Sequence, residues 1–190
     1  LAGRHGRDAV NAPRPPEDAR GGVAWLILAE RLGSLAAQLL GERPAAVELA
    51  YMGALLELDP EPLRAAAVKG LLETFTEQRV NLVNALAMAR ERGLVVAERR
   101  EPEPSRYGAL LALHVGGTEV AGTLVEGEPR IVFIDGFWVD VPTAGHLLLT
   151  KHQDKPGLVG RVGTILGEHN VNISSMQVGL TRPKFPRPDM

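Results

Sequence analysis

The chain has 190 residues, which is enough for one medium domain or two small ones built around a hydrophobic core. Apolar residues make up 45% of it, charged residues 23%, and the formal net charge is -2. This is a globular composition without the broadly basic surface that binds nucleic acid or anionic membranes. Cysteine is absent and no apolar run reaches the roughly 18 residues of a membrane span, so disulfides, thiolate metal sites and a membrane helix are not expected. We therefore expect a cytoplasmic protein whose partners are proteins or small molecules.

The N-terminal part predicts an extended arm followed by one helix. Residues 1–20 combine three prolines with charged side chains and few groups to bury, which is typical of a linker. From Val23 to Leu40 apolar side chains recur every three or four positions, and Gly41 follows the last of them. That pattern predicts an amphipathic helix closed by a glycine, and we assign residues 1–42 to this linker and helix.

Residues 43–143 predict a domain of helices and short strands. We expect a strand at Val47–Tyr51 and helices at Pro62–Phe75 and Ala85–Glu91. Five β-prone segments follow, at Leu94–Glu98, Tyr107–Val115, Glu119–Val125, Arg130–Ile134 and Phe137–Val141. Their close spacing predicts antiparallel hairpins, with Asp135-Gly136 as the strongest turn signal.

Residues 144–179 predict a βαβ unit. His146–His152 and Val171–Val178 are expected to be strands, and Leu158–Glu168 an amphipathic helix between them. The second strand alternates irregularly, which a bulge near Ser174-Ser175 would explain. The predicted fold class is thus α/β (α+β), with a mixed or antiparallel sheet followed by the βαβ unit. Residues 180–190 hold three prolines and three basic residues and are expected to be a disordered tail.

Familiar catalytic and cofactor motifs do not fit. Gly157, Gly160 and Gly163 have G-x-x-G-x-x-G spacing, whereas a dinucleotide fingerprint is G-x-G-x-x-G. The five histidines form no ligand pair on one helix face, and no serine lies in a nucleophile elbow. We therefore predict no catalytic residue, no metal ligand and no bound cofactor in this chain.

The loop 152–157 together with Asn172 is the candidate binding site. Pro156 and Gly157 at the helix start leave first-turn amide groups free to meet a small carboxylate. In a right-handed βαβ unit the strand carrying Asn172 runs parallel to the one ending at His152, so both side chains could meet an amino acid. Asp154 would face its ammonium group. The alternative is structural, with Asp154 capping the helix and Asn172 satisfying a turn.

Several collinear segments resemble long-form D-3-phosphoglycerate dehydrogenases, and the similarity runs from about residue 8 to 179. HQDKPGLVGRVGTILGEHNVNISSMQVG (152–179) is similar to the first half of their ACT domain. Four further segments resemble the family's intervening allosteric domain, namely VKGLLE (68–73), VNLVNALAMARERGL (80–94), VAGTLVEGEPRIVFIDGFWVDV (120–141) and GHLLLTKHQDKPG (145–157). DAVNAP (8–13) and LAERLGSLAAQL (28–39) are similar to the end of the catalytic core.

The resemblance implies a regulatory role in serine biosynthesis. It implies that residues 43–143 form the intervening allosteric domain and that residues 144–179 form a partial, ferredoxin-like ACT domain. It also implies that ACT domains pair across subunits and bind L-serine. The family's effector-binding His and Asn fall on His152 and Asn172, while Asp154 replaces a family Asn. A carboxylate can replace an amide acceptor but not its donor, so another small amino acid, or none, is an open alternative.

The resemblance also implies what this chain does not carry. The family's NAD fingerprint and its catalytic Arg, Glu and His lie upstream of the matching segments, so we predict no activity from this chain alone. Its partner is then either a second copy or a dehydrogenase catalytic chain. The alternative function is a freestanding ACT-type amino-acid sensor acting on another protein. Family members also bind anionic effectors through basic residues of the intervening domain, for which Arg130 is a candidate here.

Overall fold

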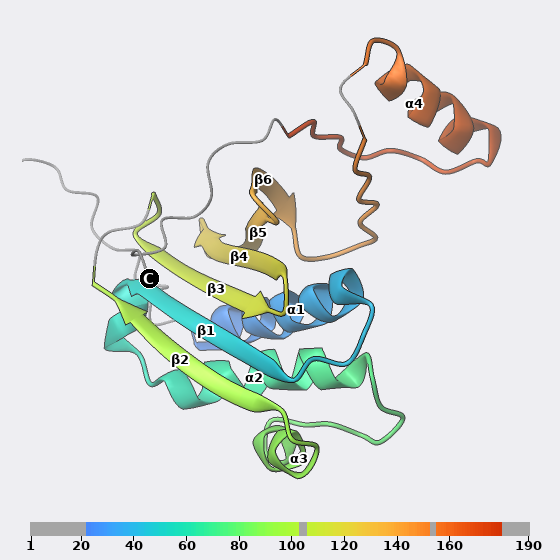
Figure 1. Cartoon of the computed structure of the whole chain (residues 1–190). Helices are drawn as coiled ribbons and strands as arrows, with labels where there is room; N and C mark the ends of the chain where they lie inside the picture. Colours follow the sequence, from blue (N-terminus) through green and yellow to red (C-terminus); the bar gives the residue numbers. More distant parts are fainter. Residues whose placement is uncertain (1–21, 103–105, 153–154, 180–190) are drawn as a thin grey trace, which may run out of the picture.

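A six-stranded mixed sheet with two long helices against one face forms the centre of the protein (Figure 1). The structure is a computed structural model that describes residues 22–102, 106–152 and 155–179. The helices are α1 (Gly22–Leu40), the short 3-10 helix η2 (Ala54–Glu57), α2 (Pro60–Glu73), α3 (Ala85–Glu91) and α4 (Leu158–Glu168). The strands are β1 (Ala46–Gly53), β2 (Val95–Glu101), β3 (Ala109–Val115), β4 (Thr118–Val125), β5 (Glu128–Ile134) and β6 (Phe137–Pro142).

The helix predictions are confirmed, and local chemistry explains where each helix begins or ends. Gly41 follows α1 with a φ of 72°, the left-handed conformation that glycine adopts without strain. Asp59 precedes α2, and its carboxylate accepts a hydrogen bond from the Glu61 N–H at 3.0 Å. With Pro60 in the first turn, α2 starts two residues before the predicted Pro62.

The sheet order is β2-β1-β3-β4-β5-β6. Strands β3 to β6 pair antiparallel with their chain neighbours, as predicted. Asp135 and Gly136 both have positive φ, 45° and 92°, in the turn between β5 and β6, as a two-residue hairpin turn requires. The mixed α/β fold class is therefore confirmed.

Strand β2 corrects one prediction. Its segment was expected to form an antiparallel hairpin, but β2 pairs with β1 in parallel and lies at the sheet edge. The connection from β1 to β2 contains α2 and α3, so it is long enough for a parallel crossover. Strand β3 then pairs with the other side of β1.

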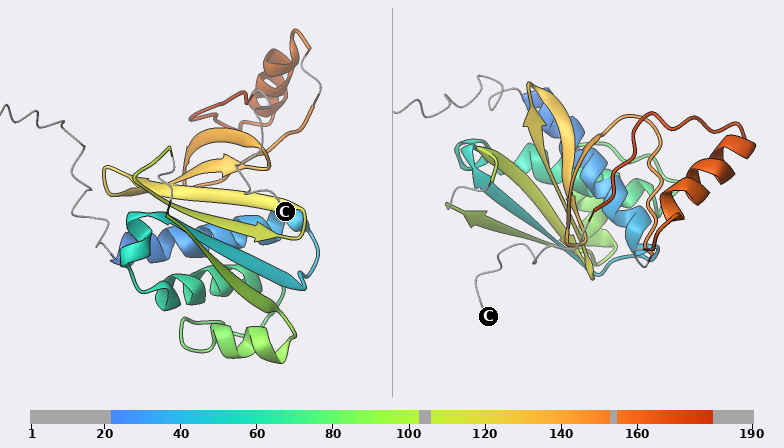
Figure 2. Two further views of the ribbon diagram at one scale, coloured as in Figure 1. Left: turned by 60° about the vertical axis from the view of Figure 1, so that its left-hand side comes forward. Right: turned by 90° about the horizontal axis from the view of Figure 1, so that it is seen from above.

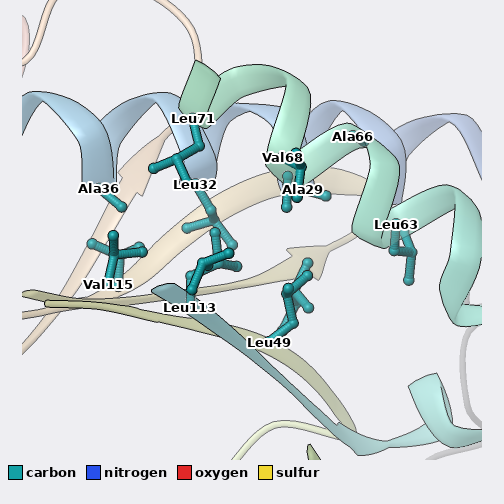
Figure 3. Packing of buried hydrophobic residues seen from close by; sticks show 14 of the residues in the cluster. Ala29, Leu32, Ala36, Leu49, Leu63, Ala66, Val68, Leu71, Leu113 and Val115 are labelled. Atoms are coloured by element: carbon teal, nitrogen blue, oxygen red, sulfur yellow. The ribbon is translucent and has the colours of Figure 1, made fainter. Parts of the chain in front are cut away.

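The main core lies between the sheet and helices α1 and α2. Figure 3 shows Leu32 and Ala36 of α1 and Leu71 of α2 directed toward Leu113 and Val115 of the sheet. All five side chains are fully buried. By length and composition alone α1 could cross a membrane, but core helices pass the same test. Its buried apolar face gives α1 the role of a core helix.

Two glycines allow α1 and α2 to cross closely. A Cβ on Gly33 would stand 2.0 Å from the Ala67 carbonyl oxygen, and one on Gly70 would stand 1.9 Å from the Glu30 carbonyl oxygen. Lys69 adds ion pairs to Glu30 at 2.5 Å and Glu73 at 3.4 Å. Burial disfavours the charged form of Lys69 and by itself would lower its pKa. The two carboxylates outweigh this effect and raise the pKa of Lys69.

The C-terminal segment contains the predicted helix without its predicted strands. Residues 158–168 form α4, whereas 146–152 and 171–178 form no strand in the structure. The two strand predictions are therefore wrong here, and with them the bulge at Ser174-Ser175. A two-stranded pair with one helix buries little apolar surface, so β-propensity alone does not hold it together. Figure 2 shows α4 standing off from the sheet, and no residue of α4 is buried.

Tyr51 provides a pH-dependent contribution to stability. Its side chain is buried in the main core, and its hydroxyl donates to Glu98 Oε1 at 3.4 Å. Burial, followed by the negative charge of Glu98, raises the pKa of Tyr51 above its ordinary value. Above about pH 10 a tyrosine ionises in the unfolded chain before it ionises here, so unfolding releases a proton and stability falls.

Tyr51→Phe should flatten this alkaline loss, because the replacement has no proton to release. The free energy of unfolding, measured by urea titration between pH 8 and pH 11, should fall less steeply in the variant. An equal slope in both proteins would show that Tyr51 does not titrate in this way.

Candidate effector site

The loop before α4 contains the residues predicted to bind an effector. Gly157 is the N-cap of α4 and has a φ of 87°, a left-handed conformation that a residue with a Cβ rarely adopts. No atom lies within 4 Å of where a Cβ on Gly157 would stand. Glycine is therefore required here by the backbone conformation, and the start of the helix is open to solvent.

His152 and Asn172 lie on either side of α4 and both are exposed. Asp154 lies outside the described residues. The predicted parallel strand pairing, which would bring positions 152 and 172 to adjacent strands, is not formed. The helix and its loop are thus in place, but the structure does not bring the predicted site together through a sheet.

The C-terminal segment contacts the sheet along the edge strand β6. The Gln177 side chain accepts a hydrogen bond from the Asp140 N–H at 2.9 Å and donates one to the Asp140 carbonyl at 2.6 Å. Lys151 Nζ lies 3.0 Å from Asp135 Oδ2, with its side chain 74% exposed. Exposed ion pairs of this kind contribute little to stability.

Apolar side chains around α4 face solvent. Val159 and Ile165 of the helix are 48% and 50% exposed. The flanking segments add Leu147, Leu148, Leu149, Val171, Ile173, Met176 and Val178. Apolar groups gathered this densely on a surface are typical of an interface. The C-terminal segment therefore exposes more large apolar side chains than a short surface segment usually does.

A second polar cluster, which sequence reasoning missed, crosses the sheet face opposite the helices. Arg99 Nε of β2 lies 2.9 Å from Glu48 Oε1 of β1, and Arg99 also pairs with Glu101. Arg99 Nη2 lies 3.4 Å from His114 Nε2, and His114 Nδ1 lies 3.5 Å from Glu119 Oε1. We call these five residues the polar row.

The polar row follows from strand register. Glu48 pairs with His114 between β1 and β3, and His114 pairs with Glu119 across the Gly116-Gly117 turn. The pairing of His114 with Glu119 could have been found from the sequence, because a two-residue turn places them opposite each other. The Arg99 contact depends on the parallel pairing of β2, which the sequence did not indicate.

Arg130, the anion-binding candidate, is engaged within the sheet. Its Nε donates to Asp140 Oδ1 at 2.7 Å and its Nη2 donates to the Asp140 carbonyl at 3.2 Å. These contacts pair Arg130 with the neighbouring strand β6, so its guanidinium already has an anionic partner. Across residues 22–102, 106–152 and 155–179 no group of three or more His, Asp or Glu is placed to hold a metal ion.

Comparisons with known proteins find two successive domain matches along the chain. Residues 23–135 match the D-3-phosphoglycerate dehydrogenase intervening domain, and residues 146–189 match the ACT domain. The second match supports a ferredoxin-like unit in the C-terminal segment.

Among curated relatives, three proteins named D-3-phosphoglycerate dehydrogenase are similar over nearly the whole chain. The one from Synechocystis sp. is 41% identical over 186 residues, which cover 94% of this chain and 34% of the relative. The one from Archaeoglobus fulgidus is 37% identical, covering 94% of this chain and 35% of the relative. The one from Methanocaldococcus jannaschii is 34% identical, covering 96% and 36%.

The chain thus spans about a third of the length of these relatives. The match to the intervening domain alone extends over more than half of the chain, from the start of α1 to the turn between β5 and β6. The chain therefore belongs to the D-3-phosphoglycerate dehydrogenase intervening-domain family and carries an ACT domain match after it.

Proposed function

We propose that this chain is the regulatory and oligomerisation part of a D-3-phosphoglycerate dehydrogenase of L-serine biosynthesis, and that it does not catalyse the reaction by itself. The observation that carries the proposal is the order of the two matched domains, intervening domain then ACT domain, along one chain. An NAD site and the catalytic residues would belong to another part of the enzyme, which works in the cytoplasm.

The effector is an amino acid such as L-serine, bound at the loop before α4. Gly157 supports this, because its open, left-handed backbone leaves the start of the helix accessible to a carboxylate. His152 and Asn172 would supply polar side chains, and Asp154 would face the effector's ammonium group. The exposed apolar side chains around α4 support a site completed by a second copy or by a catalytic chain.

Calorimetric titration of the pure chain tests effector binding. L-Serine, glycine and L-alanine should be compared with the wild-type chain and with His152→Ala and Asn172→Ala. We expect heat of binding with at least one amino acid and about a tenfold or greater loss of affinity in each variant, since each replacement removes polar contacts of about 1.5 kcal/mol. A parallel titration with NAD should give no heat.

His146→Ala is the matched control, because His146 is an exposed histidine on the same segment outside the loop. It should bind like the wild type. If none of the amino acids gives heat, or if His152→Ala and Asn172→Ala bind normally, the effector site is elsewhere. Binding of NAD would contradict the assignment of the cofactor to another part of the enzyme.

A freestanding ACT-type sensor is the second candidate, since the ACT match does not depend on a dehydrogenase domain. Adding the purified catalytic part of a family dehydrogenase distinguishes the two candidate functions. A regulatory part should bind it and make its turnover respond to the amino acid. A sensor for another protein should bind the amino acid without affecting the dehydrogenase.

A further inference from the structure

Strand β2 is an open edge of the sheet. Among the strands of the described residues it pairs with β1 alone, and Figure 1 shows it as the outermost strand. Its side chains are accessible, since Val95 is 63% exposed and Glu98 and Arg100 are also exposed. An edge strand presents a row of backbone N–H and C=O groups to which another extended strand can add.

The hydrogen bonds of β2 to its neighbour fix which residues face outward. The Val95 N–H donates to the Ala45 carbonyl at 2.9 Å, on the side of β1. Successive residues of a strand direct their backbone groups alternately to its two sides. Val96, Glu98 and Arg100 therefore direct their backbone groups toward the open edge.

A second copy of β2 fits this edge when it runs antiparallel. Outward residues must then meet outward residues, so the registers centred on this strand place Glu98 opposite its own copy, Glu98 opposite Arg100, or Arg100 opposite its own copy. The first and the last put like charges directly opposite each other, which destabilises a strand pair, whereas the middle register forms two Glu–Arg pairs. In that register Val96 meets Pro102, which lacks an N–H but can accept a hydrogen bond through its carbonyl. Charge therefore selects one register.

Contacts within one chain leave these charges available for the pairing. Glu98 Oε1 lies 3.2 Å from Arg64 Nη1 and accepts a hydrogen bond from the Tyr51 hydroxyl at 3.4 Å. Both contacts use the same oxygen, so Oε2 can accept from a second guanidinium. Arg99 would lie opposite its own copy on the other face of the sheet, but its Nε is drawn 2.9 Å from Glu48 Oε1 of β1, away from the edge.

We propose that β2 pairs antiparallel with β2 of a second copy of this chain, Glu98 opposite Arg100, so that the two sheets join into one. The charges that protect the edge from unselective pairing thereby specify a single partner strand. This interface is separate from the C-terminal segment and does not depend on effector binding, so it can fail or hold independently of the proposed function.

Charge exchange between two variants tests the pairing. Arg100→Glu alone and Glu98→Arg alone each turn both opposite-charge pairs of the dimer into like-charge pairs. Each should raise the dissociation constant of the dimer by about tenfold or more, measured by sedimentation velocity. An equimolar mixture of the two variants restores both Glu–Arg pairs and should associate like the wild type. Failure of the mixture to associate, with native circular dichroism in both variants, would overturn the proposal.

Two controls separate this edge from other surfaces. Arg79→Glu makes the same charge change at an exposed position in the loop before α3 and should leave association unchanged. Val159→Asp combined with Ile165→Asp places charge among the exposed apolar side chains of α4 and should leave the β2 pairing in place. If those α4 changes abolish association while Arg100→Glu has no effect, the dimer forms through the C-terminal segment and the proposal is wrong.

Amide hydrogen exchange locates the pairing in the wild-type chain. Exchange at Val96, Glu98 and Arg100 should slow as the protein concentration rises through the dissociation constant. The Val95 amide, bonded to Ala45, should be protected at every concentration. Fast exchange at Glu98 and Arg100 in the associated protein would contradict the pairing. Slow exchange at every concentration would assign the edge to another segment of the same chain and would also contradict it.

Discussion

Gly70→Ala should lower the free energy of unfolding by about 3 kcal/mol, although alanine normally stabilises a helix interior by about 1 kcal/mol relative to glycine. The reason is the close crossing of α1 and α2. A Cβ at position 70 would stand 1.9 Å from the Glu30 carbonyl oxygen and 3.0 Å from the Ser34 amide nitrogen. Both are backbone atoms, so relief requires moving a whole helix against the core.

Urea unfolding followed by circular dichroism measures this effect, and an unchanged dependence on urea would show that only stability has changed. Gly163→Ala is the matched control, because Gly163 is inside α4 with no atom within 4 Å of its Cβ position. It should leave stability unchanged or raise it slightly. A Gly70→Ala protein as stable as the wild type would show that the two helices do not cross this closely.

Leu32→Ala should lower the free energy of unfolding by about 2–5 kcal/mol, because a buried leucine truncated in a packed core loses its transfer energy and leaves a cavity. Leu32 is fully buried, and Figure 3 shows it between α2 and the strand residues Leu113 and Val115. The cost depends on how far these neighbours can close the space.

Val83→Ala is the control for this truncation. Val83 is 92% exposed in the loop before α3, so removing two of its methyl groups should change stability by no more than about 0.5 kcal/mol. Both variants should be compared under the same urea conditions. A loss below about 1 kcal/mol for Leu32→Ala would place position 32 outside the core.

Local sequence signals were sufficient to predict those elements whose contacts join residues close together along the chain. The helix spacing from Val23 to Leu40 matches α1, and the segment Ala85–Glu91 matches α3. The turn at Asp135-Gly136 predicted the β5–β6 hairpin, since its backbone needs two positive φ angles. In each case the information lies within one element or one turn.

The C-terminal segment shows where local signals fail. Val171 to Val178 is rich in β-prone residues, but a strand exists only when a neighbouring strand supplies its hydrogen bonds. Propensity predicted the strand, and the structure has no such neighbour for it among the described residues. For the same reason His152 and Asn172 were correctly placed on either side of α4, while their meeting remains a prediction.

The sequence by itself determined the helices α1 to α4, the antiparallel run from β3 to β6, the family and the glycine at the start of α4, because each depends on local periodicity, turn geometry or a collinear motif. Only the tertiary structure decided that β2 joins β1 in parallel, that Gly33 and Gly70 bring two helices into backbone contact, and that Arg99 meets Glu48 and His114. These features join positions far apart along the chain. Their pairing depends on which elements pack together, and no local pattern carries that information.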